Sequence, residues 1–237
     1  MVPIPTGPPR KKPMTVTSTS TTARHAPADR PNLRADFPVR ISRTLQLCPD
    51  CAAAVRREYR CNEVISIAGA DGTIAPLYYR GTVRNAMKRF KFSSAAYCAD
   101  WFAAQMSVAL TAQLDDWQPD LITYMPIGFL HYRKRGYNQA ELLAKLVAKP
   151  LSLPCEATLR KRWFVGKQSA QKDYAARQSN AKDAVLPKGG VDLTEKSVVL
   201  VDDIITTGAT AAAAVKTLRE MGASRVYVLA ATFTPRK

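Results

Sequence analysis

Long hydrophobic runs are missing from this sequence, which has no apolar stretch near the roughly 18 residues that a membrane span requires. It also lacks a basic start followed by an apolar stretch, the pattern of a secretory signal. We therefore expect a cytoplasmic protein without a membrane span. Hydrophobic residues make up 46% and charged residues 23% of the 237 residues, a composition that is typical of soluble globular proteins and excludes a fibrous or fully disordered chain.

Acidic residues are scarce, with 19 Asp and Glu against 35 Lys and Arg and a formal net charge of +16. An excess of this size attracts polyanions such as nucleic acids or phosphorylated small molecules. A solvated basic surface with no specific partner gives the same composition, so the charge alone does not choose among these possibilities.

Cysteines are few and odd in number, which argues against a framework of disulfides. Three of the five, Cys48, Cys51 and Cys61, lie close together in a chain that we expect to be intracellular, and this pattern fits metal ligation better than disulfides. Cys98 falls in a predicted helix and Cys155 near a predicted strand, so we interpret both as small buried hydrophobic residues.

Composition divides the chain into three parts. Residues 1–47 are rich in Pro, Thr, Ser and Arg, and we expect a disordered basic tail rather than a transit peptide, because the segment encodes no amphipathic helix. Residues 48–75 are predicted to form a small Cys-rich module, and residues 76–237 a single α/β domain.

Apolar residues at a spacing near 3.6 predict three helices in that domain. Their core faces are Val83, Met87 and Phe90, then Phe102, Met106 and Leu110, then Leu142, Leu143, Leu146 and Val147. Residues 121–125 are predicted to form a short buried strand that Pro126 stops. The polar and basic stretch 160–180 indicates a long mobile loop.

The last third of the chain predicts a parallel βαβ unit. Residues 198–201 form a continuous apolar strand, residues 209–221 follow as a helix closed by Gly222, and residues 225–232 form the next strand. In such a unit the ligand site lies at the carboxyl end of the first strand.

A hydroxyl-rich turn follows that first strand. Asp202 and Asp203 come first, and the turn then presents a phosphate loop of Thr206, Thr207, Gly208, Ala209 and Thr210. Gly208 lets the backbone approach an anion, while N–H groups at the helix start and the threonine hydroxyls can donate to phosphate. The two carboxylates suit the hydroxyls of a ribose and can hold Mg²⁺. A helix cap beside two surface aspartates explains Thr207 but not the whole arrangement.

This stretch resembles the phosphoribosyl diphosphate motif of the type I phosphoribosyltransferases, in which four apolar and two acidic residues precede a Thr-Thr-Gly-x-Thr loop. A wider resemblance, from Cys48 to Thr232, points to the ComF family of phosphoribosyltransferase-like proteins associated with bacterial DNA uptake. Its blocks are Cys48-x-x-Cys51, Tyr79-Arg80-Gly81, Lys88-Arg89-Phe90-Lys91-Phe92, Pro126, Arg133-Lys134-Arg135-Gly136-Tyr137-Asn138-Gln139, and Gln168, Gln171, Arg177 and Asn180.

The resemblance implies a type I phosphoribosyltransferase fold, a parallel sheet flanked by helices, that binds phosphoribosyl diphosphate or a nucleotide with Mg²⁺. The segment after strand 121–125 would be the diphosphate loop, and residues 160–180 the mobile hood. In such transferases diphosphate leaves the anomeric carbon through an oxocarbenium-like transition state. Arg133 and Arg135 are the candidate cations for the leaving group, although a solvated charge cluster gives the same pattern. We interpret His131 as a solvated loop residue rather than an acid catalyst.

The ComF resemblance also implies an N-terminal zinc module with four cysteines, from which this sequence departs. Cys48, Cys51 and Cys61 supply three thiolates, but no cysteine follows Cys61 to complete a second Cys-x-x-Cys. A closed zinc site takes four ligands, so another group has to complete it. The candidates are Glu63, Asp50, His25 or a water.

Two functions fit these features. The first is an enzyme, a pentosyl glycosyltransferase that moves a phosphoribosyl group to a nitrogenous acceptor, with Asp202 and Asp203 holding the ribose and Mg²⁺. The second is a non-catalytic component of the DNA-uptake machinery that binds a nucleotide or single-stranded DNA and contacts DNA-uptake proteins. The intact motif favours the first, and the net charge of +16 with its basic tail favours the second.

Overall fold

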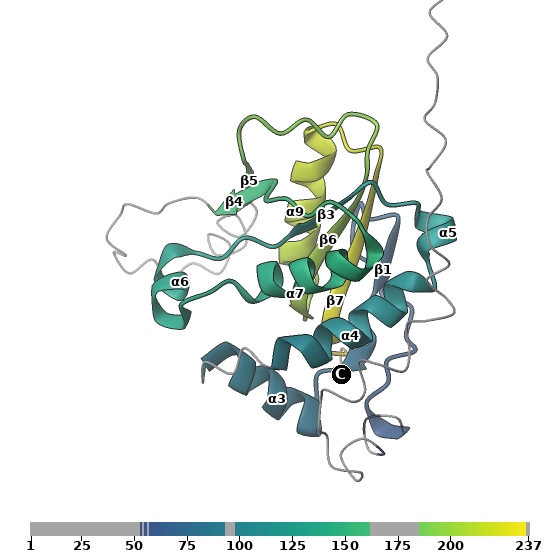
Figure 1. The fold of residues 1–237 in the computed structure, drawn as a ribbon, viewed down its shortest axis with the longest axis vertical. Helices are drawn as coiled ribbons and strands as arrows, with labels where there is room; N and C mark the ends of the chain where they lie inside the picture. The colour runs from purple at the N-terminus through teal and green to yellow at the C-terminus, as the bar shows by residue number, and fades with distance from the viewer. Residues whose placement is uncertain (1–52, 54, 56, 93–97, 162–184, 236–237) are drawn as a thin grey trace, which may run out of the picture. The chain divides into compact units, whose positions relative to one another are not determined.

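A parallel β-sheet is the centre of the described structure (Figure 1). The structure is a computed structural model that describes residues 53, 55, 57–92, 98–161 and 185–235. The sheet has five strands, of which four follow the order β1-β7-β6-β3. The fifth strand, β2, also pairs with β7, closer to the C-terminal end of β7 than β1 does. The strands are β1 (Gly72–Ile74), β2 (Leu77–Tyr78), β3 (Leu121–Tyr124), β6 (Ser197–Ile205) and β7 (Arg225–Phe233). The predicted α/β class with a parallel sheet is confirmed.

Helices cover both faces of the sheet. Helices α4 and α7 lie on one face and α9 on the other, while α3 packs against α4 (Figure 1). The helices are α3 (Gly81–Phe92), α4 (Cys98–Thr111), α5 (Leu114–Trp117), α6 (Phe129–Arg135), α7 (Gln139–Ala148), the 3-10 helix η2 (Lys149–Leu151) and α9 (Ala209–Glu220). A separate antiparallel pair consists of β4 (Leu159–Lys161) and β5 (Val185–Pro187).

The continuous apolar run in β6 is explained by cover on both faces. Val199 and Val201 pack into the core on the side of α4 and α7, whereas Val198 and Leu200 pack into the core on the side of α9. All four side chains are fully buried. A strand buried on both faces has no position that favours a polar side chain, so the sequence does not alternate.

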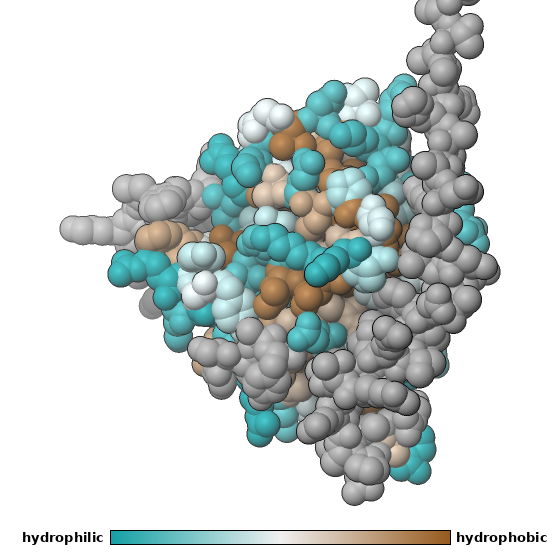
Figure 2. All heavy atoms as spheres, viewed as in Figure 1, coloured by the Kyte–Doolittle hydropathy of each residue, from teal (hydrophilic) through white to brown (hydrophobic). Residues whose placement is uncertain are grey.

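The predicted core faces of the first two helices are confirmed, and that of α7 needs a correction. The apolar residues predicted for α3 and α4 are all buried. In α7, Leu143 and Val147 are fully buried, whereas Leu142 and Leu146 are only half-buried. Apolar residues gather over α7 on the visible face (Figure 2). The buried face of α7 includes small residues instead, among them Ala140 and Ala144, because the helix lies close to the sheet.

Strand β6 is longer than the sequence predicts. It was expected to end at Val201, but its pairing with β7 continues through Asp202 to Ile205. Both carboxylates of the motif therefore project from a strand held by its neighbour, rather than from a loop. This pairing fixes their backbone before any ligand binds.

The predicted tail, hood and domain boundary can be compared with the structure only in part. The predicted tail and residues 162–180 of the predicted hood lie outside the described residues. Strand β1 precedes the domain boundary predicted at residue 76, yet it pairs with β7 in the main sheet. Within the described residues, no helix combines the length and apolar character that crossing a membrane would require.

Candidate functional site

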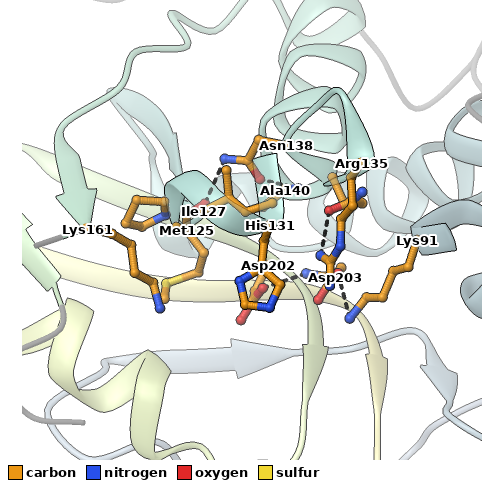
Figure 3. Close-up of a pocket in the computed structure, with 13 residues that line it drawn as sticks. Lys91, Met125, Ile127, His131, Arg135, Asn138, Ala140, Lys161, Asp202 and Asp203 are labelled. Atoms are coloured by element: carbon orange, nitrogen blue, oxygen red, sulfur yellow. Dashed lines mark hydrogen bonds and ion pairs between the residues drawn. The ribbon is translucent and has the colours of Figure 1, made fainter. Parts of the chain in front are cut away.

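Two adjoining clefts open at the carboxyl ends of β3 and β6. We call the larger one the basic cleft; it has a volume of about 210 Å³. The residues that line it are Lys91, Met125, Pro126, Ile127, Gly128, His131, Arg135, Asn138, Gln139, Ala140, Lys161, Asp202 and Asp203 (Figure 3). The second, the threonine cleft, has a volume of about 170 Å³. The residues that line it are Met125, Pro126, Lys161, Asp202, Ile204, Ile205, Thr206, Thr207, Gly208, Thr210 and Ala211.

The two carboxylates meet a lysine from a distant helix. Lys91 in the last turn of α3 places its Nζ atom 2.8 Å from Oδ2 of Asp203, and the two side chains are only 18% and 14% exposed (Figure 3). Helix α3 is held in place next to this pair, since the fully buried ring of Phe90 packs against Tyr137 with 5.8 Å between ring centroids. The Tyr137 hydroxyl also donates a hydrogen bond to the Phe90 carbonyl. The ion pair therefore joins α3 to the end of β6.

Asp202 has an electrostatic environment that disfavours its charge. Desolvation by burial and the neighbouring Asp203 carboxylate raise the pKa of Asp202 to about 8, while Lys91 and Lys161 act in the opposite direction. One oxygen of Asp202 accepts a hydrogen bond of 2.8 Å from the backbone N–H of Asp203. A divalent cation at this place would favour the ionised form of both carboxylates.

The carboxylate pair fits the donor set that Mg²⁺ uses. This hard cation is usually held by one or two carboxylates together with phosphate oxygens and waters. Asp202 and Asp203 supply the carboxylates, and both line the basic cleft. Asp203 would have to exchange its contact with Lys91 for such a cation.

The phosphate loop lies between β6 and the N-terminus of α9. Gly208 adopts a φ of +78°, a left-handed conformation that residues other than glycine rarely adopt, so the loop favours glycine at this position. The side chains of Thr206, Thr207 and Thr210 are exposed at the threonine cleft. Thr207 Oγ1 accepts a long hydrogen bond of 3.4 Å from the N–H of Ala209. A phosphate in this cleft would meet hydroxyl donors and the positive end of the helix dipole.

Asn138 ties the segment after β3 to the strand that precedes it. Its side-chain oxygen accepts a hydrogen bond of 3.1 Å from Ala140 N, which caps α7. Its Nδ2 atom donates to the carbonyl of Met125 at 3.0 Å. This one buried side chain therefore fixes both ends of the predicted diphosphate loop, which contains the short helix α6.

The two candidate arginines of α6 have different surroundings. Arg135 lines the basic cleft, donates from Nη1 to Oε1 of Gln139 at 3.0 Å, and lies 5.2 Å from the centroid of the Phe92 ring. Arg133 lies over the Phe129 ring at 5.7 Å and is not among the described residues that line either cleft. His131, which was expected in a loop, lies in α6 and lines the basic cleft.

Three residues of the basic cleft had no role in the sequence prediction. Lys91 and Gln139 belong to blocks that carry the family resemblance, so the sequence marked them without indicating what they contact. Lys161 is the second residue of the predicted hood, 160–180, and reaches both clefts from the end of β4. Lys91 and Lys161 are far from Asp202 and Asp203 in the sequence, so sequence spacing does not indicate that the fold brings them into one cleft.

The predicted zinc ligands are described only in part. Cys48 and Cys51 lie outside the described residues. Cys61 is half-buried, its N–H donates to the Pro76 carbonyl at 3.0 Å, and burial raises the pKa of its thiol. Within the described part of the chain, no group of three or more His, Cys, Asp or Glu side chains is arranged to hold a metal ion.

The chain is similar in sequence to several known proteins. Residues 138–236 match the family model of the phosphoribosyl transferase domain. Competence protein F of Haemophilus influenzae is 30% identical over 152 residues, which are 60% of this chain and 64% of that protein. The DNA utilization protein YhgH of Salmonella typhi is 32% identical over 113 residues, 46% of this chain and 48% of that protein. The chain thus spans between about half and two thirds of the length of these relatives.

Among solved structures, the glutamine phosphoribosylpyrophosphate amidotransferase from B. subtilis, complexed with ADP and GMP, is 29% identical with a TM-score of 0.35. The match covers 47% of this chain and 22% of that one.

Proposed function

We propose that this chain, which belongs to the ComF family of phosphoribosyltransferase-fold proteins, binds phosphoribosyl diphosphate or a nucleotide together with Mg²⁺ in the two joined clefts. The observation that carries the proposal is the position of Asp202, which lines both clefts. A carboxylate pair thus lies between a hydroxyl-rich loop and a basic cleft. This order matches a ligand with a 5-phosphate, a ribose diol and a diphosphate along its length.

Each part of the ligand has matching groups in the protein. The hydroxyls and N–H groups of the phosphate loop would donate to the 5-phosphate. Asp202 and Asp203 would accept hydrogen bonds from the ribose hydroxyls, and Lys91, Arg135 and Lys161 would offset the charge of the diphosphate. Bound Mg²⁺ would neutralise further negative charge on the same group. Holding the ligand at both ends positions its anomeric carbon between the two clefts.

The proposed reaction is pentosyl transfer. The bond from the anomeric carbon to the diphosphate oxygen breaks, diphosphate leaves with the electron pair, and a nitrogen of the acceptor forms the new bond and loses its proton. The cations of the basic cleft stabilise the charge that develops on the leaving oxygen. We assign this contact to Arg135 rather than to Arg133, because Arg135 lines the cleft.

We also propose a role linked to competence and DNA utilization, for which the names of the two curated relatives are the support. The candidate partners are single-stranded DNA and DNA-uptake proteins. The net charge of +16 favours a polyanionic partner, whether or not transfer occurs.

Thr207→Val tests the phosphate loop. The change keeps the β-branched shape and removes one hydroxyl, and losing a hydrogen bond to a charged group should weaken the binding of phosphoribosyl diphosphate by roughly tenfold to a hundredfold. Calorimetry on the purified protein with Mg²⁺ measures this. Thr82→Val, at an exposed position at the start of α3, is the matched control and should bind normally. Undiminished binding by a folded Thr207→Val protein would show that this loop does not hold the phosphate.

The N-terminal cysteines lead to a separate proposal, one zinc ion held by Cys48, Cys51 and Cys61 with a fourth ligand from elsewhere. Three neighbouring thiolates supply most of the affinity of such a site. Elemental analysis of protein purified without chelators should find about one zinc per chain. A metal content near zero would show that the three cysteines do not hold zinc.

A further inference from the structure

Two buried hydrogen-bond donors in the basic cleft have no partner. They are the Nε2 atom of Gln139 and the Nε atom of Arg135. Gln139 is only 2% exposed, and both residues line the cleft. Only one other buried side-chain nitrogen or oxygen of the described residues lacks a partner, Oγ1 of Thr234. Because a buried donor without an acceptor costs free energy, their concentration in one cleft points to a ligand that supplies acceptors.

The orientation of the Gln139 amide is fixed by its neighbour. Oε1 accepts from Nη1 of Arg135 at 3.0 Å, so the amide nitrogen has to point the other way, since a flipped amide would set donor against donor. Arg135 is itself held over the Phe92 ring at 5.2 Å. Burial raises the pKa of the nearby Tyr137 phenol, and the side chain of Gln139 acts in the opposite direction.

The fold does not require a polar side chain at position 139. Asn138 already caps α7 through Ala140 N, and the other buried residues of α7 are all apolar. A buried glutamine with half of its amide unpaired is less favourable for folding than an apolar residue of similar shape. The feature is therefore explained by binding rather than by stability.

The side chains around the Gln139 amide indicate which ligand groups the basic cleft can bind. The cleft brings Lys91, Arg135 and Lys161 together with the amide, so its free donors suit oxygens that carry negative charge. Asp202 and Asp203 also line this cleft, whereas the phosphate loop lines the other one.

We propose that Gln139 is a specificity-determining residue whose amide nitrogen donates to an oxygen of the diphosphate group, so that the protein distinguishes phosphoribosyl diphosphate from ribose 5-phosphate. This inference rests on the function proposed above. Arg135 is then a positioning residue for Gln139 as well as a nearby cation. The mutual contact of the two side chains keeps the amide directed at the ligand.

The test compares two ligands on two variants. Gln139→Met keeps the length of the side chain and removes both amide groups, and Gln139→Glu replaces the donor by a negative charge. Calorimetry with Mg²⁺ should show that Gln139→Met binds phosphoribosyl diphosphate about tenfold more weakly, with a larger loss for Gln139→Glu. Affinity for ribose 5-phosphate should change less than about twofold, because this ligand lacks the diphosphate. Gln105→Met, at a half-buried position in α4, is the matched control.

Thermal unfolding separates binding from a structural role. The melting temperature of Gln139→Met should stay close to that of the wild type, because the variant loses an unpaired buried donor but also the acceptor of the Arg135 hydrogen bond. Unchanged affinity for phosphoribosyl diphosphate in both variants would overturn the inference and leave the proposed function standing. An equal loss for both ligands with a lower melting temperature would also overturn it, since a structural role gives that result. Failure of the wild-type protein to bind either ligand would reject the proposed function itself.

Discussion

Replacing Asp202 with asparagine should make the unliganded protein more stable by about 2 kcal/mol above pH 8 and weaken Mg²⁺-dependent ligand binding about a hundredfold. The two effects have the same origin. Burial and the Asp203 carboxylate raise the pKa of Asp202 to about 8, so its charged form is unfavourable in the folded protein. That same charge is what the ribose hydroxyls and Mg²⁺ would use. Losing two contacts to a charged group accounts for the expected loss of affinity.

The stability gain should depend on pH in a defined direction. An aspartate in the unfolded chain has a pKa of about 3.9. Between about pH 4 and pH 8 the folded protein therefore holds a proton that the unfolded chain has released, and the contribution of this carboxyl to stability falls as the pH rises. Asparagine carries no charge, so the gain should be near zero below pH 4 and complete above pH 8.

Urea unfolding of the wild type and of Asp202→Asn at several pH values measures this difference. The exposed Asp116 of α5 offers a control, and Asp116→Asn should show no such dependence. A difference between wild type and Asp202→Asn that stays constant from pH 4 to pH 9 would contradict the assignment.

Lys91→Met should lower the free energy of unfolding by about 2 to 4 kcal/mol. The variant removes one partner of a largely buried ion pair and leaves the Asp203 carboxylate without its cation. The same helix provides a matched control, because Lys88 is exposed and Lys88→Met should change stability by less than about 0.5 kcal/mol. Chemical denaturation gives all of these values.

A double-mutant cycle makes this prediction specific to the pair. Asp203→Asn alone should also destabilise the protein, but Lys91→Met combined with Asp203→Asn should cost less than the sum of the two single changes. Mg²⁺ should stabilise Lys91→Met more than the wild type, because its Asp203 is open to a new cation. Additive effects of the two changes would mean that the ion pair contributes nothing to stability.

The sequence predicted most of the fold because local patterns encode most of it. Apolar residues at helical spacing located α3 and α4 with their buried faces, and Gly222 closes α9 with a φ of +97° as expected. The predicted end of β6 was wrong because two aspartates interrupt the apolar run on which the prediction was based, whereas the length of the strand is set by its pairing with β7. Strand β7 continues far enough to keep Asp202 and Asp203 in the sheet.

The site was predictable only where its residues are consecutive. The phosphate loop and the two aspartates form one motif, and the structure places both at the clefts. Lys91 acquires its role from Asp203, which lies far from it in the sequence, so their spacing gives no sign of this contact. Gln139 lies only four residues after Arg135, but α6 ends at Arg135, so helical spacing does not predict their hydrogen bond. Arg133 and Arg135 look equivalent in the sequence, and only Arg135 lines the cleft.

The position of β7 in the sheet has a consequence for biosynthesis. Strand β7 pairs with β1, β2 and β6, so three strands made earlier depend on residues 225–233 for hydrogen-bond partners. While the ribosome is still translating the chain, these apolar segments have unsatisfied edges and cannot complete the sheet. Contacts between β1 and β7 also span most of the described sequence, which makes folding slow. The sheet should therefore be completed only after the synthesis of β7 rather than progressively.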